Sequence, residues 1–474
     1  MLISLKNIIF IFIVPFIYSY ISFPLFINDR NLSSLDSPKT FIEKLKTYDI
    51  YIEVSIGSEK AKVKCYLDIY ITEIMIGGEG IKNNKYNESN SESYNCSYCK
   101  IKDYYSGWYS EGIISTEDFY VYNNKNEINV VHKMNFILGK HSIYMDPPEG
   151  ICGLQLPKFG SDLNYNLIYS LKIANATNSY NWFLDYNNIQ NGQSKMIIDG
   201  FPHDLNRTKY NEEKFITSHA VAFDDLNRYP LWSLSFADIY YNNIKMNISS
   251  RDSKIARIQF DFGIIAAPNE TSSILDEQFF GKYYNANICF KDSLSIETFI
   301  YCKNTKEFDI KKFKSIYFKN VEMNIIFELS YEELFYFSDN YIYFMIIFRK
   351  DGNWIFGEPF LKKYYLVYNQ EAKTIGYYQG MEKKDNDNNN NDNNNGNNNN
   401  GNNNNGNNNN DIINQSTISL THILLILILI GIIVIAIILY LKKGKRKNRA
   451  NELEDDYEYK TQINKEKEGN RIIN

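Results

Sequence analysis

The sequence predicts a mainly β protein whose globular part is divided into two lobes. From about residue 48 to residue 379, short runs of Ile, Val, Tyr and Phe alternate with Asn, Gly and Asp, which is typical of strands separated by turns. The chain contains 39 Tyr and 30 Phe but only 10 Pro, and aromatic residues favour strands while Pro interrupts them. A segment of this length exceeds what one hydrophobic core usually holds, so two lobes are expected.

The predicted strands follow one another along this whole segment, and helices are expected to be few. One helix is predicted at 330–336, where Glu332 and Glu333 would occupy the first turn. The clearest predicted strands are 50–56, 61–67, 119–121, 130–138, 196–198, 313–318 and 341–348.

The N-terminal end has the features of a secretory signal peptide at residues 1–22. Lys6 precedes an apolar run at 8–17, and Ser19 and Ser22 follow it. This order matches the basic flank, short apolar region and small residues of such peptides. An uncleaved signal anchor is the alternative. Residues 23–47 would form a short N-terminal or pro-like segment ahead of the first lobe.

A transmembrane helix is predicted at 418–441, beginning at Ile418 and ending at Leu441, because no residue in this stretch is charged. At 1.5 Å per residue the stretch spans a hydrocarbon core of about 30 Å with some tilt. Lysines and arginines follow immediately, and such a flank stays in the cytosol. The sequence therefore predicts a single-pass membrane protein of the secretory pathway or cell surface. Its N-terminal domain would be lumenal or extracellular, and residues 442–474 would form a cytosolic tail.

Residues 385–414 are predicted to form a disordered stalk between the globular part and the membrane. They are almost all Asn, with Gly at positions 396, 401 and 406. Such a stretch cannot bury enough apolar area to offset the loss of chain entropy on folding.

The charge balance and the histidines exclude two classes of function. The chain has 51 Lys and Arg against 56 Asp and Glu, whereas a nucleic-acid-binding protein needs a surplus of basic residues on one face. The five histidines are scattered, and no second C-x-x-C completes a zinc site. We therefore expect no nucleic acid, no metal and no cofactor.

The cysteines and sequons fit an oxidising compartment. Cys289 and Cys302, and the C-x-x-C of Cys96 and Cys99, are disulfide candidates in a secreted domain. Glycosylation acceptors on the lumenal side would be Asn31, Asn87, Asn95, Asn175, Asn206, Asn247, Asn269 and Asn414.

Two segments of the chain resemble each other. An apolar run ends on a carboxylate at 65–68 (Cys-Tyr-Leu-Asp) and again at 258–261 (Ile-Gln-Phe-Asp). Each is followed further on by two apolar residues and a glycine, at 151–153 and 355–357. This repeated arrangement resembles the pepsin-like aspartic protease family, in which each lobe supplies one Asp from a loop at the end of a strand.

Other segments resemble the same family in collinear order. The sequence Tyr-Ser-Gly-Trp-Tyr-Ser-Glu-Gly, which begins at Tyr105, is similar to the flap hairpin, with Tyr105 at the flap tyrosine. The segments at 149–154 and 354–361 are similar to two further family motifs. The resemblance implies a bilobal pepsin-like fold with an N-terminal lobe at 48–215 and a C-terminal lobe at 216–380.

The resemblance also implies a catalytic dyad of Asp68 and Asp261. Two such carboxylates share one proton and hold a water between them, which hydrolyses a peptide bond at acidic pH. A peptide or protein would bind in the cleft between the lobes, with Tyr105 and Gly263 as substrate-binding residues.

The two catalytic triplets depart from the family's D-T/S-G. They read Asp68-Ile69-Tyr70 and Asp261-Phe262-Gly263, so both hydroxyls that normally bond across the lobes are missing. Removing partners from a buried network costs geometry that catalysis needs. The alternative function is therefore a catalytically inactive pepsin fold that acts as a peptide- or protein-binding receptor or scaffold.

Two further cysteines are expected to flank the first site. Cys65 and Cys152 would lie on neighbouring strands beside Asp68, either as buried free thiols or as a disulfide.

Overall fold

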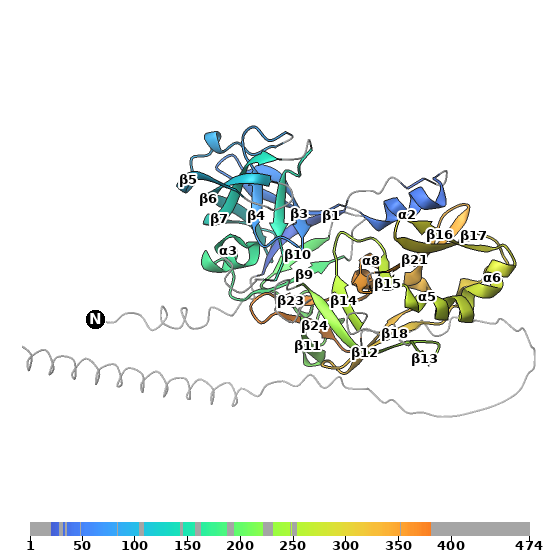
Figure 1. The fold of residues 1–474 in the computed structure, drawn as a ribbon. Coiled ribbons are helices and arrows are strands. Elements are labelled where there is room, and N and C mark those ends of the chain that lie inside the picture. The colour runs from blue at the N-terminus through green and yellow to red at the C-terminus, as the bar shows by residue number, and fades with distance from the viewer. Residues whose placement is uncertain are drawn as a thin grey trace, which may run out of the picture. The chain divides into compact units, whose positions relative to one another are not determined.

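The computed structural model describes most of the chain between residues 20 and 380 (Figure 1). These residues belong to one compact unit, and the backbone alone is described at 97–103. Most of the predicted signal peptide, and all of the stalk, the membrane helix and the tail, lie outside the described residues. No helix in the described part of the chain is long and apolar enough to cross a membrane. The described ranges are 20–27, 32–33, 36–47, 49–82, 84–103, 109–142, 146–156, 163–186, 194–220, 231–246, 248, 254–350 and 352–380.

The first of two sheets contains the N-terminal strands together with two strands from the C-terminal end of the described chain. The C-terminal strands β23 and β24 pair with β9 and β11, so the two ends of this unit share one sheet. In spatial order its strands are β11 (Phe215–His219), β24 (Thr374–Tyr378), β23 (Val367–Asn369), β9 (Asn181–Asp185), β10 (Lys195–Ile198), β1 (Ile21–Ile27), β2 (Ile50–Ile56), β3 (Ala61–Asp68), β8 (Gly150–Gly153), β4 (Ile74–Gly77), β7 (Ile128–Ser142), β6 (Tyr109–Asn123) and β5 (Asn95–Asp103).

The second sheet is built from the strands of the C-terminal half. Two short strands lie off its main path, because β13 (Ile244–Lys245) pairs with β12 and β20 (Phe335–Phe337) pairs with β21. The path itself runs through β16 (Cys289–Leu294), β17 (Glu297–Lys303), β21 (Tyr341–Arg349), β15 (Ile265–Pro268), β22 (Trp354–Phe356), β14 (Ile255–Ile258), β12 (Ser233–Tyr241), β18 (Ile316–Asn320) and β19 (Ile325–Leu329).

The helices are short and lie between these strands. Residues 270–285 form a continuous helical stretch that the sequence did not predict, made of α5 (Glu270–Leu275), the π-helical η6 (Asp276–Phe280) and α6 (Gly281–Asn285). The other helices are α2 (Pro38–Lys46), α3 (Leu167–Ile173), α4 (Pro202–Leu205), α7 (Tyr331–Leu334) and α8 (Glu358–Lys363), with 3-10 turns η1 (Glu88–Asn90), η2 (Leu163–Tyr165), η4 (Glu212–Lys214) and η7 (Ile310–Lys312).

The helix predicted at 330–336 exists but is shorter. Ser330 caps its start, because the backbone N–H of Ser330 donates to the Glu333 carboxylate (2.8 Å) while its hydroxyl accepts from the Glu332 N–H (3.3 Å). The helix ends at Leu334 because the next three residues pair with β21. Strand pairing overrides the helical pattern at this end.

The same arrangement of four strands occurs once in each sheet. In the first sheet β3 runs parallel to β8, β8 is antiparallel to β4, and β4 is parallel to β7. In the second sheet β14, β22, β15 and β21 repeat this order and these directions. The repeat confirms the mainly β class and places the ends of β3 and β14 in equivalent positions.

A buried aromatic cluster fills the region where the C-terminal strands join the first sheet. Trp182 stacks on Tyr368 with ring centroids 4.3 Å apart, and Trp232 and Phe260 meet the same ring edge-on. The indole N–H of Trp232 donates to the carbonyl of Leu154 (2.7 Å). All four rings are at most 2% exposed, so they make a rigid base beneath the two strand ends.

Candidate active site

The first loop of the site begins where β3 ends at Asp68. The backbone N–H groups of Tyr70 and Ile71 donate to the Asp68 carboxylate at 2.6 and 3.2 Å. Below it passes β8, whose Gly153 has no room for a side chain, since a Cβ would lie 2.5 Å from the carbonyl oxygen of Ile71. The loop is therefore tightly wound around its carboxylate, although the family's glycine is replaced here by Tyr70.

The second loop follows β14 and contains Asp261. Its crossing strand is β22, and a Cβ at Gly357 would lie 2.0 Å from the carbonyl oxygen of Phe262. The N–H of Gly263, the glycine of this triplet, donates to the carbonyl of Lys46 at 3.0 Å. In this loop the glycine N–H is therefore committed to a segment outside the catalytic triplet.

That segment is α2, which packs on the second loop. Its apolar residues Phe41, Ile42 and Leu45 are buried in one cluster with Phe262 and Ile264, and Thr47 forms an isolated antiparallel bridge with Phe262. Lys46 pairs with Glu297 of β17 at 2.6 Å. Figure 1 shows this blue helix beside β16 and β17, far from it in sequence. Of the predicted N-terminal or pro-like segment, α2 thus covers the apolar side of the Asp261 loop, whereas residues 23–27 belong to β1 of the first sheet.

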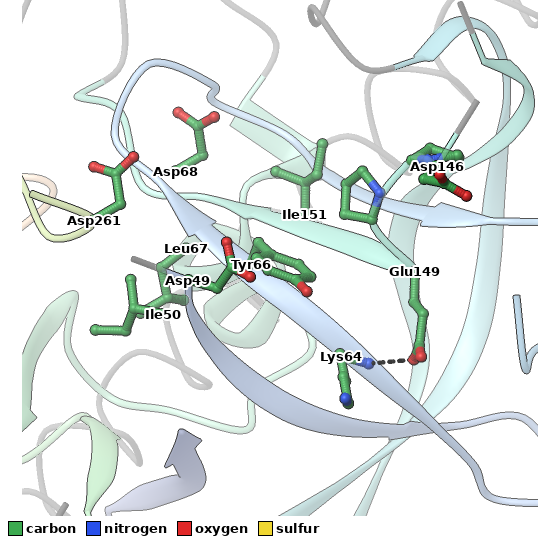
Figure 2. A pocket seen from close by; sticks show the side chains of 12 residues that line it. Asp49, Ile50, Lys64, Tyr66, Leu67, Asp68, Asp146, Glu149, Ile151 and Asp261 are labelled. Carbon is green, nitrogen blue, oxygen red and sulfur yellow. Dashed lines mark hydrogen bonds between the residues drawn. The ribbon is translucent and has the colours of Figure 1, made fainter. Parts of the chain in front are cut away.

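Asp68 and Asp261 line one cavity of about 420 Å³ (Figure 2). Both carboxylates lie at the same end of it in the figure, while Asp146 and Glu149 lie at the other. The Glu149 carboxylate accepts from the backbone N–H of Lys64 at 2.9 Å. The remaining lining is Asp49, Ile50, Tyr66, Leu67, Pro147, Pro148 and Ile151. The structure therefore brings together the two carboxylates that the sequence assigned to the dyad.

Burial raises the pKa of both carboxyl groups above the ordinary Asp value, but the other causes differ. For Asp68 the N–H of Tyr70 opposes the rise in pKa, and the negative charge of Asp261 adds to it. For Asp261 the Gln259 side chain, the backbone N–H of Asp261 itself and the charge of Arg257 lower the pKa, while Asp49 raises it. Burial and the repulsion between the two negative charges both favour a pair that holds one proton over a fully ionised pair.

The residues that replace the family's hydroxyls are buried and apolar. Ile69 is 2% and Phe262 is 3% exposed, so neither position supplies a hydrogen bond across the lobes. Tyr70, in contrast, is 43% exposed. Its hydroxyl donates to Gln259 at 3.2 Å, and the Arg257 guanidinium lies 5.3 Å from its ring centre.

The structure describes only part of the predicted flap. Tyr105 lies outside the described residues, whereas β5 and β6 form the antiparallel hairpin expected around it. Tyr109, at the start of β6, is 1% exposed and packs with Met75. Its hydroxyl donates to the carbonyl of Pro148 beside the cavity, which ties the base of the hairpin to the cavity wall.

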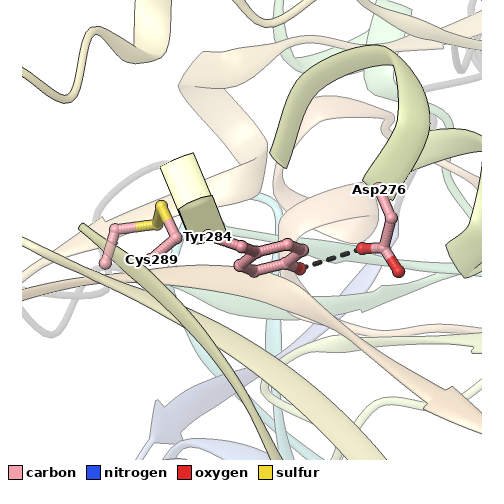
Figure 3. The surroundings of a disulfide bond; sticks show 4 residues. Asp276, Tyr284 and Cys289 are labelled. Carbon is pink, nitrogen blue, oxygen red and sulfur yellow. Dashed lines mark hydrogen bonds between the residues drawn. A yellow bond between two sulfur atoms is a disulfide. The ribbon is translucent and has the colours of Figure 1, made fainter. Parts of the chain in front are cut away.

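Of the two predicted disulfides, the structure describes one completely and the other only in part. Cys289 and Cys302 form a disulfide with an S–S distance of 2.06 Å between directly opposed residues of β16 and β17. Figure 3 shows it near Tyr284, whose hydroxyl donates to Asp276 at 2.9 Å. Cys96 is also disulfide-bonded, but the Cys99 side chain lies outside the described residues.

The two cysteines beside Asp68 were expected to be either free thiols or a disulfide, and they are free thiols. Cys65 and Cys152 are free and buried, and burial together with contact between the two raises the pKa of Cys152. Within the described residues no group of His, Cys, Asp and Glu could hold a metal ion.

Sequence reasoning missed three contributors to the site. Asp49 stands just before β2, Gln259 just after β14, and the α2 carbonyl of Lys46 comes from the N-terminal segment. Only Gln259 carried a signal, as a lone polar residue between Ile258 and Phe260 at the end of an apolar strand. The other two depend on packing between segments distant in sequence.

A comparison with family models matches the eukaryotic aspartyl protease family over residues 50–379. The match covers more than half of the chain, so the chain belongs to this family. A search of curated proteins finds no match to the chain. The pepsin-like fold that the motifs implied is thereby confirmed together with the two-sheet architecture.

Proposed function

We propose that this protein is an aspartic endopeptidase that hydrolyses peptide bonds at acidic pH through Asp68 and Asp261. The observation that carries the proposal is the meeting of both carboxylates in one cavity, each from the equivalent loop of a repeated four-strand unit. The raised pKa of each carboxyl group supports a shared proton at mildly acidic pH.

In the proposed reaction the ionised carboxylate takes a proton from a water held between the two groups. The protonated carboxyl group donates its proton to the scissile carbonyl oxygen, and the water oxygen bonds to the carbonyl carbon. The intermediate collapses when the carboxyl group that took the proton of the water gives it to the leaving nitrogen, the other carboxylate takes a proton from a hydroxyl of the intermediate, and the C–N bond breaks. The two apparent pKa values belong to the pair rather than to either residue.

The cavity beside the dyad would take part of a peptide substrate. Ile50, Leu67 and Ile151 give it apolar walls, and apolar walls with a few polar groups are typical of substrate pockets. We expect turnover to be slow, because Ile69 and Phe262 leave the second carboxylate without the hydroxyl network that usually orients it.

The second candidate is a peptide-binding protein without turnover. It is favoured by the N–H of Gly263, which donates to Lys46 rather than to the dyad. A fold of this kind would keep the cleft and bind a peptide or protein there without cleaving it.

We further propose that the protein has the membrane topology predicted from its sequence. A cleaved N-terminal signal peptide and a helix at 418–441 would place the protease domain outside the cytosol on a single-pass anchor. The disulfide of Cys289 and Cys302 supports an oxidising compartment. Protease protection of the domain in sealed microsomes would support this topology, and digestion of it in intact microsomes would contradict it.

The test of the proposed function is cleavage of a mixed peptide library by the purified full-length protein at acidic pH. We expect slow cleavage that a pepstatin-like transition-state mimic blocks, and that Asp68→Asn and Asp261→Asn each abolish because the pair acts as one unit. Asp292→Asn, on exposed strand β16, is the matched control and should keep the activity. An inert wild-type protein that still captures peptides would favour the binding function.

A further inference from the structure

A polar group that joins the two lobes lies next to the dyad but outside the cavity. The Tyr70 hydroxyl donates to Gln259 Oε1 at 3.2 Å, and Arg257 Nη2 donates to the same oxygen at 3.4 Å. Tyr70 follows β3 of the first sheet, whereas Arg257 lies in β14 of the second and Gln259 follows that strand. None of the three lines the cavity. The dyad therefore has the cavity on one side and this polar group on another.

Tyr70 and Arg257 are both accessible from the solvent. Tyr70 is 43% exposed, and Arg257 is partly exposed. The guanidinium carbon lies 5.3 Å from the centre of the Tyr70 ring, which is within the range of a cation–π contact. A ring over the guanidinium carbon uses none of its five N–H groups, so the contact holds the guanidinium in place without consuming its donors.

Arg257 has no carboxylate partner among the described residues. Its Nη2 donates to a neutral amide, and its Nε is buried without a hydrogen-bond partner in the described part of the chain. Arg349, whose charge also acts on Tyr70, is instead paired with Glu297 at 3.7 Å. A half-buried cation that lacks an opposite charge is costly, and a bound anion offsets that cost.

The guanidinium is also close to the reacting groups. Burial raises the pKa of both Asp261 and Tyr70, and the charge of Arg257 opposes the rise at both. The backbone N–H of Tyr70 donates to the Asp68 carboxylate at 2.6 Å. An extended peptide advances about 3.4 Å per residue, so a substrate group about one to three residues beyond the scissile bond would reach Arg257.

We propose that Arg257 is a specificity-determining residue that binds a carboxylate of the substrate beyond the scissile bond. The carboxylate is either the α-carboxylate at the C-terminal end of the peptide or the side chain of an Asp or Glu. A guanidinium is the group best matched to a carboxylate, through short charge-assisted hydrogen bonds. The inference rests on the proposed function, because it names what the same site selects.

The test uses two matched pairs of peptides, built on sequences that the full-length protein cleaves or captures at about pH 5, where substrate carboxylates are mostly ionised. The first pair differs only in a free or an amidated C-terminus. The second pair is amidated and carries Glu or Gln about two residues beyond the scissile bond. In at least one pair the carboxylate should be preferred about tenfold or more in kcat/KM or in Kd, which is the effect of one charge-assisted hydrogen bond. The first pair identifies an α-carboxylate and the second an acidic side chain.

Variants of Arg257 tie the preference to this side chain. Arg257→Met should make the two members of each pair equivalent, and a preference that persists in it would overturn the proposal. Arg257→Lys keeps the charge without the planar fork, so its preference should fall several-fold, which keeps the test valid if Arg257→Met does not fold. Arg207→Met, at an exposed position after α4, is the matched control and should keep the full preference.

Failure of this inference can be told apart from failure of the proposed function. A wild-type protein that cleaves both members of both pairs equally would refute the carboxylate subsite and leave the peptidase in place. A wild-type protein that cleaves nothing but captures the carboxylate member through Arg257 would support the subsite and refute the peptidase. A protein that neither cleaves nor captures any peptide would overturn both.

Discussion

Each of the two loops of the site follows a strand of its own four-strand unit, and the two units have the same arrangement. The loops are nevertheless completed in different ways. The Asp68 loop is closed by its own backbone, since the N–H groups of Tyr70 and Ile71 point at the carboxylate. The Asp261 loop is closed from outside, because α2 packs on its apolar side and the Lys46 carbonyl accepts the N–H of Gly263. The four-strand arrangement therefore fixes where each carboxylate lies, whereas segments distant in sequence can complete the loop around it.

The largest effect should come from the crossing glycines, which the two halves share. Gly357→Ala places a Cβ 2.0 Å from the Phe262 carbonyl, against 2.5 Å from the Ile71 carbonyl for Gly153→Ala. Because backbone must move in both cases, we expect losses of roughly 3 to 5 kcal/mol, with Gly357→Ala the more severe. Urea unfolding of the purified variants measures this.

Gly200→Ala is the control for the glycine pair. Its nearest contact is the Cβ of Tyr20 at 3.0 Å, so less has to move than at either crossing glycine and its cost should be smaller. A Gly357→Ala protein as stable as wild type would show that the crossing strand does not press on the loop.

The next effect separates the two loops. Phe41 of α2 is 2% exposed and stacks on Tyr343 at 4.2 Å, so Phe41→Ala should cost about 3 kcal/mol. Hydrogen exchange should accelerate at the Gly263 amide, which donates to the α2 carbonyl of Lys46, and stay unchanged at the Tyr70 amide. Glu43→Ala on the exposed face of the same helix is the matched control. Equal acceleration at both amides would contradict the separate closure of the two loops.

The cysteines give a further contrast between the halves. The second sheet is stapled by Cys289 and Cys302, while Cys65 and Cys152 beside Asp68 are free thiols. Replacing the bonded pair by Ala should cost about 2 to 3 kcal/mol for a loop of this length. The faster exchange should be confined to β16 and β17 and should spare β3 and β8. Hydrogen exchange that rises equally in both sheets would mean that the disulfide stabilises the whole unit.

The smallest effect concerns the charges of the two carboxylates. A carboxyl group whose folded pKa is raised is stabilising in its protonated form below the unfolded pKa, and that stability is lost as pH rises through the folded pKa. Both Asp68 and Asp261 are of this kind. Asp68→Asn and Asp261→Asn should therefore each be more stable than wild type near neutral pH and no more stable at about pH 3. Solvent in the cleft keeps the gain small, and thermal unfolding at the two pH values measures it.

Much of the scaffold could be predicted from the sequence because its signals are local. An apolar strand that ends on Asp, followed later by two apolar residues and a glycine, identified the end of β3 and the crossing strands β8 and β22. In the second half the strand β14 ends at Ile258, so Asp261 lies in the loop after it. Alternation with a period of two and the order of two apolar residues before a glycine can be read from short segments of the chain.

The completion of the site could not be predicted because it depends on contacts between distant segments. Phe41, Ile42 and Leu45 show only that a helix has an apolar face, not that this face covers Phe262. In the sequence, Tyr70 is only a replacement of the family's glycine. The structure is needed to show that its hydroxyl reaches Gln259. The helical stretch at 270–285 was missed because its Phe and Tyr residues favour strands locally, and tertiary packing decided the outcome.

The most direct test of the account is whether the two differently completed loops act as one dyad. Calorimetric titration of the full-length protein with a pepstatin-like transition-state mimic at roughly pH 4, where a shared proton is expected, measures this without requiring fast turnover. We expect wild type to bind the mimic and Asp68→Asn and Asp261→Asn each to abolish binding, because either substitution destroys the shared proton. Unaltered binding by the Asp261→Asn protein would show that the second carboxylate is not part of the site, and would contradict the account.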